Sequence, residues 1–372
     1  MYFNFLTILP TLTSHFFELA QSAFFICAGI AGIGFIIGFH ELGHFLIGRL
    51  CGLSFHNFSI GFGPKLISRK FLNTDFSISL IPLGGYVEPV EGNTAQPTPG
   101  TLAGTSYLKK MYIILGGITF NLIFAYGAFV YLFTTGMPSN PFTANNSPFI
   151  IQEFRTADSP AQKDGLLVND MIIKANDIDV NKNISTLQRI IKENPNKPLK
   201  LTIIRNDQEK ELITTPKEKV IGNETVGSLE VVFSFKALEP LSLIESIKKA
   251  YNLTVSITTA TALSFKNIFK KKSTDGLAGP LGMIATSSQT ARHSFTQFLL
   301  LLAIISIGLA VLNVIPLPIL DGGQVVTYTI EALIRRPINE KTKTAIHLTC
   351  WVLMLTLVIF LTFKDIKMLW FK

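Results

Sequence analysis

Residues Gly29–Leu50 read GIAGIGFIIGFHELGHFLIGRL, a long apolar run that one polar pentapeptide, HELGH at His40–His44, interrupts. On a helix, His40 and His44 lie four residues apart on one face, so both imidazoles can bind a single divalent metal ion. Glu41 projects beside them, where it could take a proton from a water at the metal without being a ligand. Ionisable groups are costly in a hydrophobic segment, so we interpret the pentapeptide as a metal site rather than as packing histidines with a snorkelling glutamate.

The composition of the 372-residue chain indicates a membrane protein, because 48% of the residues are hydrophobic and only 16% are charged. The net charge of +8 could indicate nucleic-acid binding. No stripe of Lys and Arg with interleaved aromatic residues is present, so we expect no nucleic-acid partner and an anionic lipid surface instead. The three cysteines, Cys27, Cys51 and Cys350, offer neither a zinc spacing nor a disulfide framework. We also expect no cleavable signal peptide, because the first residues lack a positive charge.

Four segments are long and apolar enough to span a membrane. They are residues 22–47, which carry the pentapeptide, and residues 111–134, 298–320 and 345–363. Residues 1–21 precede the first span and are expected at the membrane interface. The predicted fold class is therefore a polytopic α-helical membrane protein with four transmembrane helices.

Residues 52–110, between the first two spans, predict a membrane-associated β-hairpin. Phe55–Ile60 and Phe76–Ile81 alternate as strands do, with turn-forming residues between them, and the second run leads to Gly84-Gly85-Tyr86-Val87. A strand edge here could pair with an extended peptide. The alternative is a self-contained hairpin that packs on the helices.

The sequence changes character after the linker Pro138–Pro148. Residues 150–235 are polar and mixed, with short β-branched runs and one helical stretch, and predict one inserted α+β domain large enough to fold alone. This domain has no catalytic cluster, so we expect a binding or gating module. Residues 241–296 predict an amphipathic interfacial helix over Leu241–Phe269 and then a turn-rich connector. A short span across Ala250–Phe265 is the alternative.

Asp321 is the predicted third metal ligand, because a catalytic zinc usually has three protein ligands and one open position. It is the only carboxylate that adjoins the third span, and Pro316 would break that helix just before it. The first and third spans run in the same direction, so their C-terminal ends share one membrane face, with Asp321 level with His40 and His44. Lys and Arg are abundant in the loops after these two spans, which marks that face as cytoplasmic and places residues 150–235 outside.

Together these segments closely resemble the site-2 protease family of intramembrane zinc metalloproteases (peptidase family M50B), in its bacterial, regulator of sigma-E protease type. The resemblance covers nearly the whole chain. It rests on HELGH at His40–His44, GGYV at Gly84–Val87, Gly-x-x-x-Asn at Gly117–Asn121 and NVIPLPILDGG at Asn313–Gly323. Ile150–Phe235 resembles a PDZ domain.

The resemblance implies a role for each matching residue. His40, His44 and Asp321 would bind Zn²⁺, and Glu41 would be the general base. Substrate-binding roles would fall to two groups, the helix and loop residues Asn121, Asn313 and Pro316 and the hairpin residues Gly84, Gly85, Tyr86 and Val87. The hairpin would present an edge to a substrate helix and unwind it into a strand. From the residues alone, Asn121 could equally be a hydrogen-bonding contact between helices.

The resemblance also implies partners and a location. Substrates would be single-span membrane proteins, such as anti-sigma factors already shortened by another protease, and remnant signal peptides, in a bacterial inner membrane. The PDZ-like domain would bind a peptide or the substrate's ectodomain. Two alternatives of another class are a catalytically silent membrane PDZ scaffold and a metal transporter or sensor. The complete ligand set disfavours the scaffold, and the hairpin with a PDZ-like module is poorly explained by a transporter.

Overall fold

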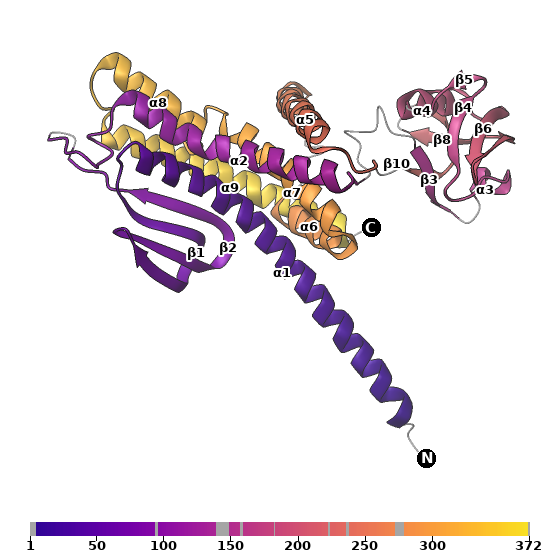
Figure 1. Ribbon diagram of the computed structural model, residues 1–372, viewed down its shortest axis with the longest axis horizontal. Coiled ribbons are helices and arrows are strands. Elements are labelled where there is room, and N and C mark those ends of the chain that lie inside the picture. The colour runs from indigo at the N-terminus through magenta and orange to yellow at the C-terminus, as the bar shows by residue number, and fades with distance from the viewer. Residues whose placement is uncertain are drawn as a thin grey trace. The chain divides into compact units, whose positions relative to one another are not determined.

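The computed structural model describes residues 5–93, 96–138, 149–156, 159–181, 183–221, 224–235, 238–271 and 279–370. Most of the expected linker, residues 139–148, lies outside these ranges. The chain divides into two compact units, one formed by residues 1–129 with 254–372 and the other by residues 130–253 (Figure 1).

Four helices in the described part of the chain are long and apolar enough to cross a membrane, as the sequence predicts. They are α1 (Phe5–Leu50), α2 (Tyr107–Thr135), α7 (Phe295–Asn313) and α9 (Glu340–Trp370). In α1, residues 17–50 form the candidate span. Helix α5 (Leu243–Lys271) is not among these four candidates.

Helix α6 (Pro280–His293) occupies part of the stretch for which the sequence predicts a turn-rich connector. Its Gly-Pro start is a helix beginning rather than a turn, because Pro at the first helical position lacks only an N–H that would have no partner anyway. The buried Asp365 carboxylate of α9 accepts the backbone N–H groups of Gly279 and Gly282 at 3.1 and 2.8 Å. This cap holds α6 in place, where it packs against α1, α7 and α9.

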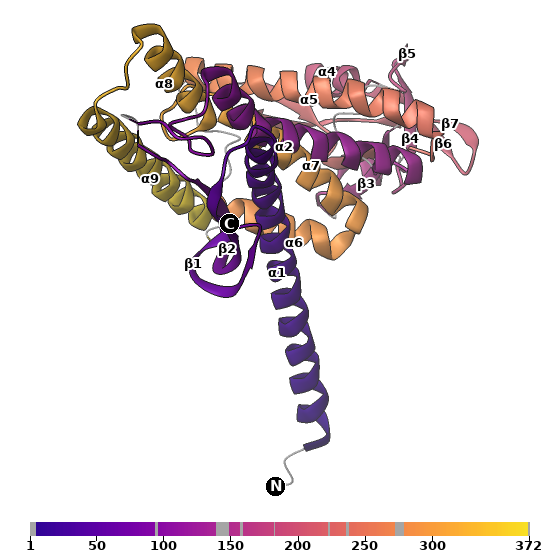
Figure 2. The same cartoon turned by 60° about the vertical axis from the view of Figure 1, so that its left-hand side comes forward.

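Helix α7 ends at Asn313, before the end of the expected third span at residue 320. Residues 314–320 are not helical, and Pro316 and Pro318 lie among them. Helix α8 (Asp321–Ile334) begins directly afterwards and leads into α9 (Figure 2). A short irregular segment therefore connects the apolar helix α7 to Asp321, the first residue of α8.

Strands β1 (Phe55–Phe71) and β2 (Thr74–Pro89) form an antiparallel hairpin with its tight turn at Leu72 and Asn73, whose φ angles are 46° and 62°. Gly61-Phe62-Gly63-Pro64, which are among the turn-forming residues between the two predicted strands, do not form this turn. Instead, Gly61 and Gly63, with φ of +91° and +86°, allow β1 to bend.

Because β1 bends, its first part pairs twice with β2. Asn57, for example, pairs with Asp75 near the start of β2 and with Glu88 near its end. Residues 85–89 of β2 consequently pair with β1 on one side only, and no strand in the described part of the chain pairs with their other side. We call this segment the edge segment.

The hairpin lies along α1 in both views (Figures 1 and 2). Phe45 of α1 fixes it there, because its ring centroid lies 5.1, 5.6 and 5.3 Å from those of Phe55, Phe58 and Phe76. Phe45, Phe55 and Phe58 are buried. Aromatic pairs at these distances stabilise packing beyond their buried area. The hairpin is therefore attached one residue after His44.

The second unit contains a six-stranded antiparallel sheet with β10, β3, β4, β6 and β7 in that order and β5 paired to β4. The elements are β3 (Phe149–Phe154), α3 (Pro160–Lys163), β4 (Met171–Ala175), β5 (Ile178–Asp179), α4 (Ile184–Glu193), β6 (Leu199–Arg205), β7 (Gln208–Thr214) and β10 (Val231–Phe235), with a separate hairpin of β8 (Lys217–Ile221) and β9 (Glu224–Ser228). Helix α4 starts at the N-cap Asn183 and buries Leu187, Ile190 and Ile191 against the sheet core.

Candidate metal centre

Helix α1 places the two histidines of the pentapeptide side by side. His40 and His44 are one helical turn apart, and their Nε2 atoms lie 3.1 Å from each other. His40 is buried and His44 is partly buried. Two ring nitrogens at this distance are close enough to share one ion.

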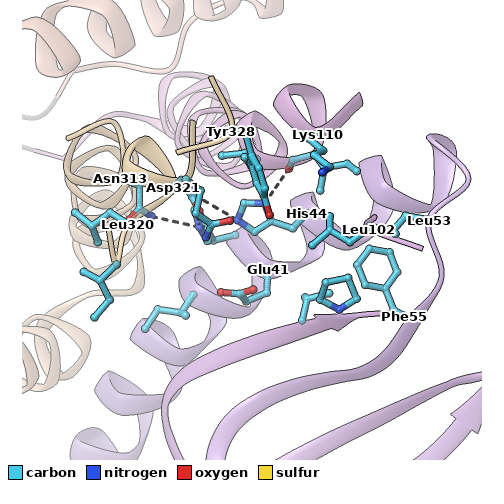
Figure 3. Close-up of a pocket in the computed structure, with 18 of the residues that line it drawn as sticks. Glu41, His44, Leu53, Phe55, Leu102, Lys110, Asn313, Leu320, Asp321 and Tyr328 are labelled. Carbon is cyan, nitrogen blue, oxygen red and sulfur yellow. Dashed lines mark hydrogen bonds and ion pairs between the residues drawn. The ribbon is translucent and has the colours of Figure 1, made fainter. Parts of the chain in front are cut away.

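Asp321, the first residue of α8, brings the third donor to the same point. Its Oδ2 atom lies 3.2 Å from His40 Nε2 and 3.4 Å from His44 Nε2. The atom is buried and has no hydrogen-bond partner among the described residues. The three residues form a group that could hold a metal ion. They come from two segments that are far apart in the sequence (Figure 3).

The outer nitrogens of both rings are held by α2. His44 Nδ1–H donates to the Ile113 carbonyl at 2.8 Å, so its Nε2 carries the free lone pair. His40 Nδ1 lies 3.1 Å from the side-chain amide nitrogen of Asn121, whose buried Oδ1 has no partner among the described residues. A half-turn of this amide would let Oδ1 accept the His40 Nδ1–H, which would leave Nε2 of His40 free as well.

These observations fit a tetrahedral zinc ion. Donors about 2.0–2.2 Å from a tetrahedral ion lie roughly 3.3–3.5 Å from one another, close to the 3.1, 3.2 and 3.4 Å separations found here. Two imidazole lone pairs and one carboxylate oxygen would converge with no proton between them, an arrangement that a cation would stabilise. Three protein donors also leave one coordination position open.

Close contact between α1 and α2 sets this geometry. A Cβ atom on Gly43 would collide with the Gly116 carbonyl, so the two backbones touch. A Cβ on Gly117 would collide with His44 Nε2 and would lie 2.7 Å from His40 Cε1. Glycine at position 117 therefore leaves the space that the two imidazole rings fill. Small residues in a span predict only a close contact between helices, so this space is a second reason for a glycine here.

Glu41 and the edge segment line the same cavity, whose volume is about 390 Å³ (Figure 3). A Cβ on Gly85 would lie 3.1 Å from Glu41 Cγ, so β2 passes directly beside this glutamate. Val87 and Pro89 continue the wall. The candidate base, the candidate ligands and a strand edge therefore share one cavity.

The structure distributes the other predicted substrate-binding residues unevenly. Asn313 lies in the cavity wall, with its side-chain amide nitrogen 3.3 Å from His40 Nε2, and Asn121 contacts His40 from behind. Pro316, Gly84, Gly85 and Tyr86 are not among the residues that line this cavity. Tyr86 instead stacks on Phe62, with ring centroids 6.4 Å apart.

Two groups that line the cavity and lie outside the spans have shifted pKa values. Burial alone would raise the pKa of the Asp321 carboxyl, but the adjacent rings of His40 and His44 outweigh it and lower the pKa to about 2. Burial raises the pKa of the Tyr328 phenol, and the nearby Glu331 carboxylate adds to this. Asp321 is thus kept as a carboxylate, the form in which it can bind a cation.

The structure also places at the site residues that the sequence does not predict there. Lys110, Gln324 and Tyr328 line the cavity, and the Ile113 carbonyl orients His44. From the sequence, Lys110 is only one of the basic residues in the loop after the first span, which mark a membrane face. A backbone carbonyl such as that of Ile113 leaves no signal in a sequence.

Comparison with known proteins is consistent with this geometry. The model of "Peptidase family M50" matches residues 28–357. A Campylobacter jejuni protein is 34% identical over 356 residues, which are 91% of this chain and 92% of that protein, and a Nostoc protein is 31% identical over 360 residues, 91% and 95% of the two chains. Both carry the name "Putative zinc metalloprotease". A chloroplastic membrane metalloprotease of Arabidopsis thaliana is 28% identical over 322 residues, 83% of this chain and 71% of that protein.

Proposed function

The chain belongs to peptidase family M50, and from this premise we propose that it is an intramembrane zinc metalloprotease that hydrolyses peptide bonds within or near the membrane spans of single-span proteins. One observation carries the proposal. Three donor atoms, from His40, His44 and Asp321, lie 3.1–3.4 Å apart in a cavity that also contains Glu41 and the edge segment. A scaffold protein has no need of the glutamate, and a transporter has no need of the strand edge.

The residues of the chain have distinct parts in this reaction. When bound, Zn²⁺ would lower the pKa of a water and polarise the peptide carbonyl. Glu41 takes a proton from the attacking water and passes it to the amide nitrogen of the leaving segment. The Asn313 side-chain amide, now 3.3 Å from His40 Nε2, is placed to donate a hydrogen bond to the carbonyl oxygen as it gains negative charge.

The edge segment accounts for how a helical substrate becomes cleavable. A peptide in an intact helix has its carbonyls in i to i−4 hydrogen bonds, so it must unwind before attack. Residues 85–89 of β2 offer backbone groups on one side to an extended chain, which replaces the lost helical hydrogen bonds. Helix-breaking residues near the cleaved bond should therefore favour a substrate.

The remaining proposals concern location and partners. We place the protein in a bacterial inner membrane, with the metal centre near the cytoplasmic face, because Lys and Arg are abundant in the loops after the first and third spans. The domain at residues 150–235 is then an extracytoplasmic PDZ-like module that binds a peptide or the substrate's ectodomain. Anti-sigma factors and remnant signal peptides are the substrates that we expect, and anionic lipid contacts the basic loops.

The test is Glu41→Gln, measured with tagged single-span reporters in membranes. We expect cleavage to fall by roughly 10²- to 10⁴-fold, because an amide cannot take the proton, while zinc content stays at that of the wild type. Glutamine has nearly the shape of glutamate, so the metal content is the control for folding. Cleavage at the wild-type rate by this variant would remove Glu41 from the mechanism.

A further inference from the structure

A second cavity, of about 560 Å³, adjoins the metal cavity. It is formed by the segment before α2, by α8 and by the start of α9, and its lining includes seven charged side chains, Glu91, Lys110, Glu331, Arg335, Arg336, Glu340 and Lys343. Leu102, Lys110 and Tyr328 line both cavities. The two spaces therefore share a wall, and a chain that leaves the metal centre past these residues enters the second cavity.

The charges in this second cavity do not balance. Lys343 Nζ is paired with Glu331 at 2.9 Å and with Glu340 at 3.4 Å. The described part of the chain provides no ion-pair partner for Lys110, Arg335 or Arg336. Counted over the whole lining, four cations face three carboxylates, so the net charge of the cavity is +1. The cavity is thus suited to a ligand that carries carboxylates.

Lys110 has the decisive position among these cations. It is half-buried and, like Tyr328, lines both cavities. Its Nζ lies 4.8 Å from the centroid of the Tyr328 ring (Figure 3). Its neighbour Lys109 is exposed, lines neither cavity and donates to the Cys51 carbonyl at 2.9 Å. Both lysines serve equally as charges that mark a membrane face. Only Lys110 is placed to contact a peptide at the metal.

We propose that the second cavity is a substrate subsite for acidic side chains a few residues from the cleaved bond, and that Lys110 is the residue that selects them. This rests on the proposed function, because the ligand is the same peptide that is hydrolysed at the metal. A volume of about 560 Å³ lies in the range of binding sites for small ligands or a short peptide stretch. The shared wall favours the substrate over lipid as the occupant.

The first experiment uses a single-span reporter with an Asp-Glu pair placed, in separate versions, at each position from two to eight residues on either side of the cleaved bond. Matched reporters carry Asn-Gln. We expect the wild type to cleave the acidic version about 5- to 10-fold faster in kcat/KM at one of these positions, as a partly buried charge pair allows. Lys110→Met should remove this preference, Lys110→Glu should favour a Lys-Lys reporter, and Lys109→Met should behave as the wild type.

A second measurement does not depend on cleavage. In the Glu41→Gln background, Ala332→Cys in the wall of the second cavity is cross-linked to a cysteine beside the Asp-Glu or Asn-Gln pair, with the three native cysteines replaced by serine. We expect higher yield with the acidic probe and equal yields once Lys110→Met is added. Zinc content of each variant is the control for an intact metal centre.

The outcomes separate the two proposals. Full cleavage by Glu41→Gln would overturn the proposed function. A second outcome is that Glu41→Gln loses cleavage, but Lys110 gives no preference for acidic residues. The cross-linking yields and the cleavage rates of the active enzyme would then be equal for the acidic and neutral versions. This outcome would overturn only the subsite. A third outcome is that the cross-linking yields of the acidic and neutral probes are equal and both fall when phosphatidylglycerol replaces phosphatidylcholine. This outcome would assign the cavity to lipid phosphate and would also overturn the subsite.

Discussion

The two walls of the metal cavity differ in how their polar groups are satisfied. On the helical wall, formed by His40, His44 and Asp321, the outer nitrogens of both rings face groups of α2, and all three inner donors point at one another. On the strand wall, the edge segment, one side of the backbone has no partner strand in the described chain. In the first wall the protein itself sets the orientation of both rings, whereas under the proposed function an extended substrate would complete the second wall.

This difference separates the two tasks of the centre. Metal ligands need fixed positions, because a misplaced ligand costs affinity, whereas a peptide edge needs free hydrogen-bonding groups. The glycines are distributed in the same way. On the helical wall, Gly117 of α2 lies in close contact with His40 and His44, and on the strand wall, Gly61 and Gly63 allow β1 to bend. Substitutions in the two walls should therefore fail in different ways.

The largest effect is expected for Gly117→Ala, which tests whether the helical wall is as fixed as the contacts indicate. Its Cβ would collide with His44 Nε2 and would push His40 as well. We expect zinc content and kcat/KM both to fall by roughly 100-fold, because two ligands move together. Metal analysis and reporter cleavage measure this.

Gly127→Ala is the matched control on the same helix, since a Cβ there would meet no neighbouring atom within 4 Å. It should retain zinc and activity. Normal zinc content in Gly117→Ala would contradict the assignment of the ligand pair.

Asn121→Leu should have the next largest effect and sharpens the role of the outer hydrogen bonds. Loss of the amide removes the partner of His40 Nδ1, so the ring is no longer held in one orientation. We expect zinc affinity to fall roughly 10- to 100-fold, measured by competition with a chromophoric chelator, with activity restored by excess zinc.

The control for Asn121→Leu is Ser306→Ala, which removes a 2.9 Å hydrogen bond from α7 to the Asn121 backbone carbonyl but leaves the amide in place. Equal loss of zinc in both variants would show that Asn121 acts only as a contact between helices.

The convergence of His40, His44 and Asp321 could be predicted, because it follows from short-range periodicity and from the direction of the spans. His40 and His44 share a helix face at any tilt, and Asp321 follows the third span by topology alone. Helices α6 and α8 were not predicted, because Gly279-Pro280 is typical of turns, and α8 begins immediately after a broken span. The capping carboxylate of Asp365 is 86 residues from Gly279, so no local sequence pattern predicts this cap.

The hairpin shows a second limit of sequence reading. Alternation identifies strand residues, but it does not show that β1 bends and pairs with both ends of β2, which is what makes residues 85–89 an edge. The same limit applies to Lys110 and Tyr328. Their role depends on a cavity wall assembled from α2 and α8, so only the folded chain distinguishes Lys110 from Lys109.

The smallest effect is expected for Gly85→Ala, which tests the strand wall without touching a ligand. Its Cβ would lie 2.9 Å from the Ser59 carbonyl oxygen and 3.1 Å from Glu41 Cγ, so β2 and the glutamate must separate by a few tenths of an ångström. We expect kcat to fall about 10-fold with zinc content unchanged, because a displaced base slows proton transfer but leaves the metal bound.

Gly308→Ala on α7, where a Cβ meets no neighbouring atom within 4 Å, provides the control for Gly85→Ala. If Gly85→Ala lost zinc in proportion to activity, the strand wall would support the ligands too, and the division between a fixed metal wall and an open peptide wall would fail. If its kcat fell while its zinc content stayed normal, the functions of the two walls would be separable, because one added methyl group in each wall would affect a different property. Gly117 would then control metal binding, and Gly85 would control the chemical step.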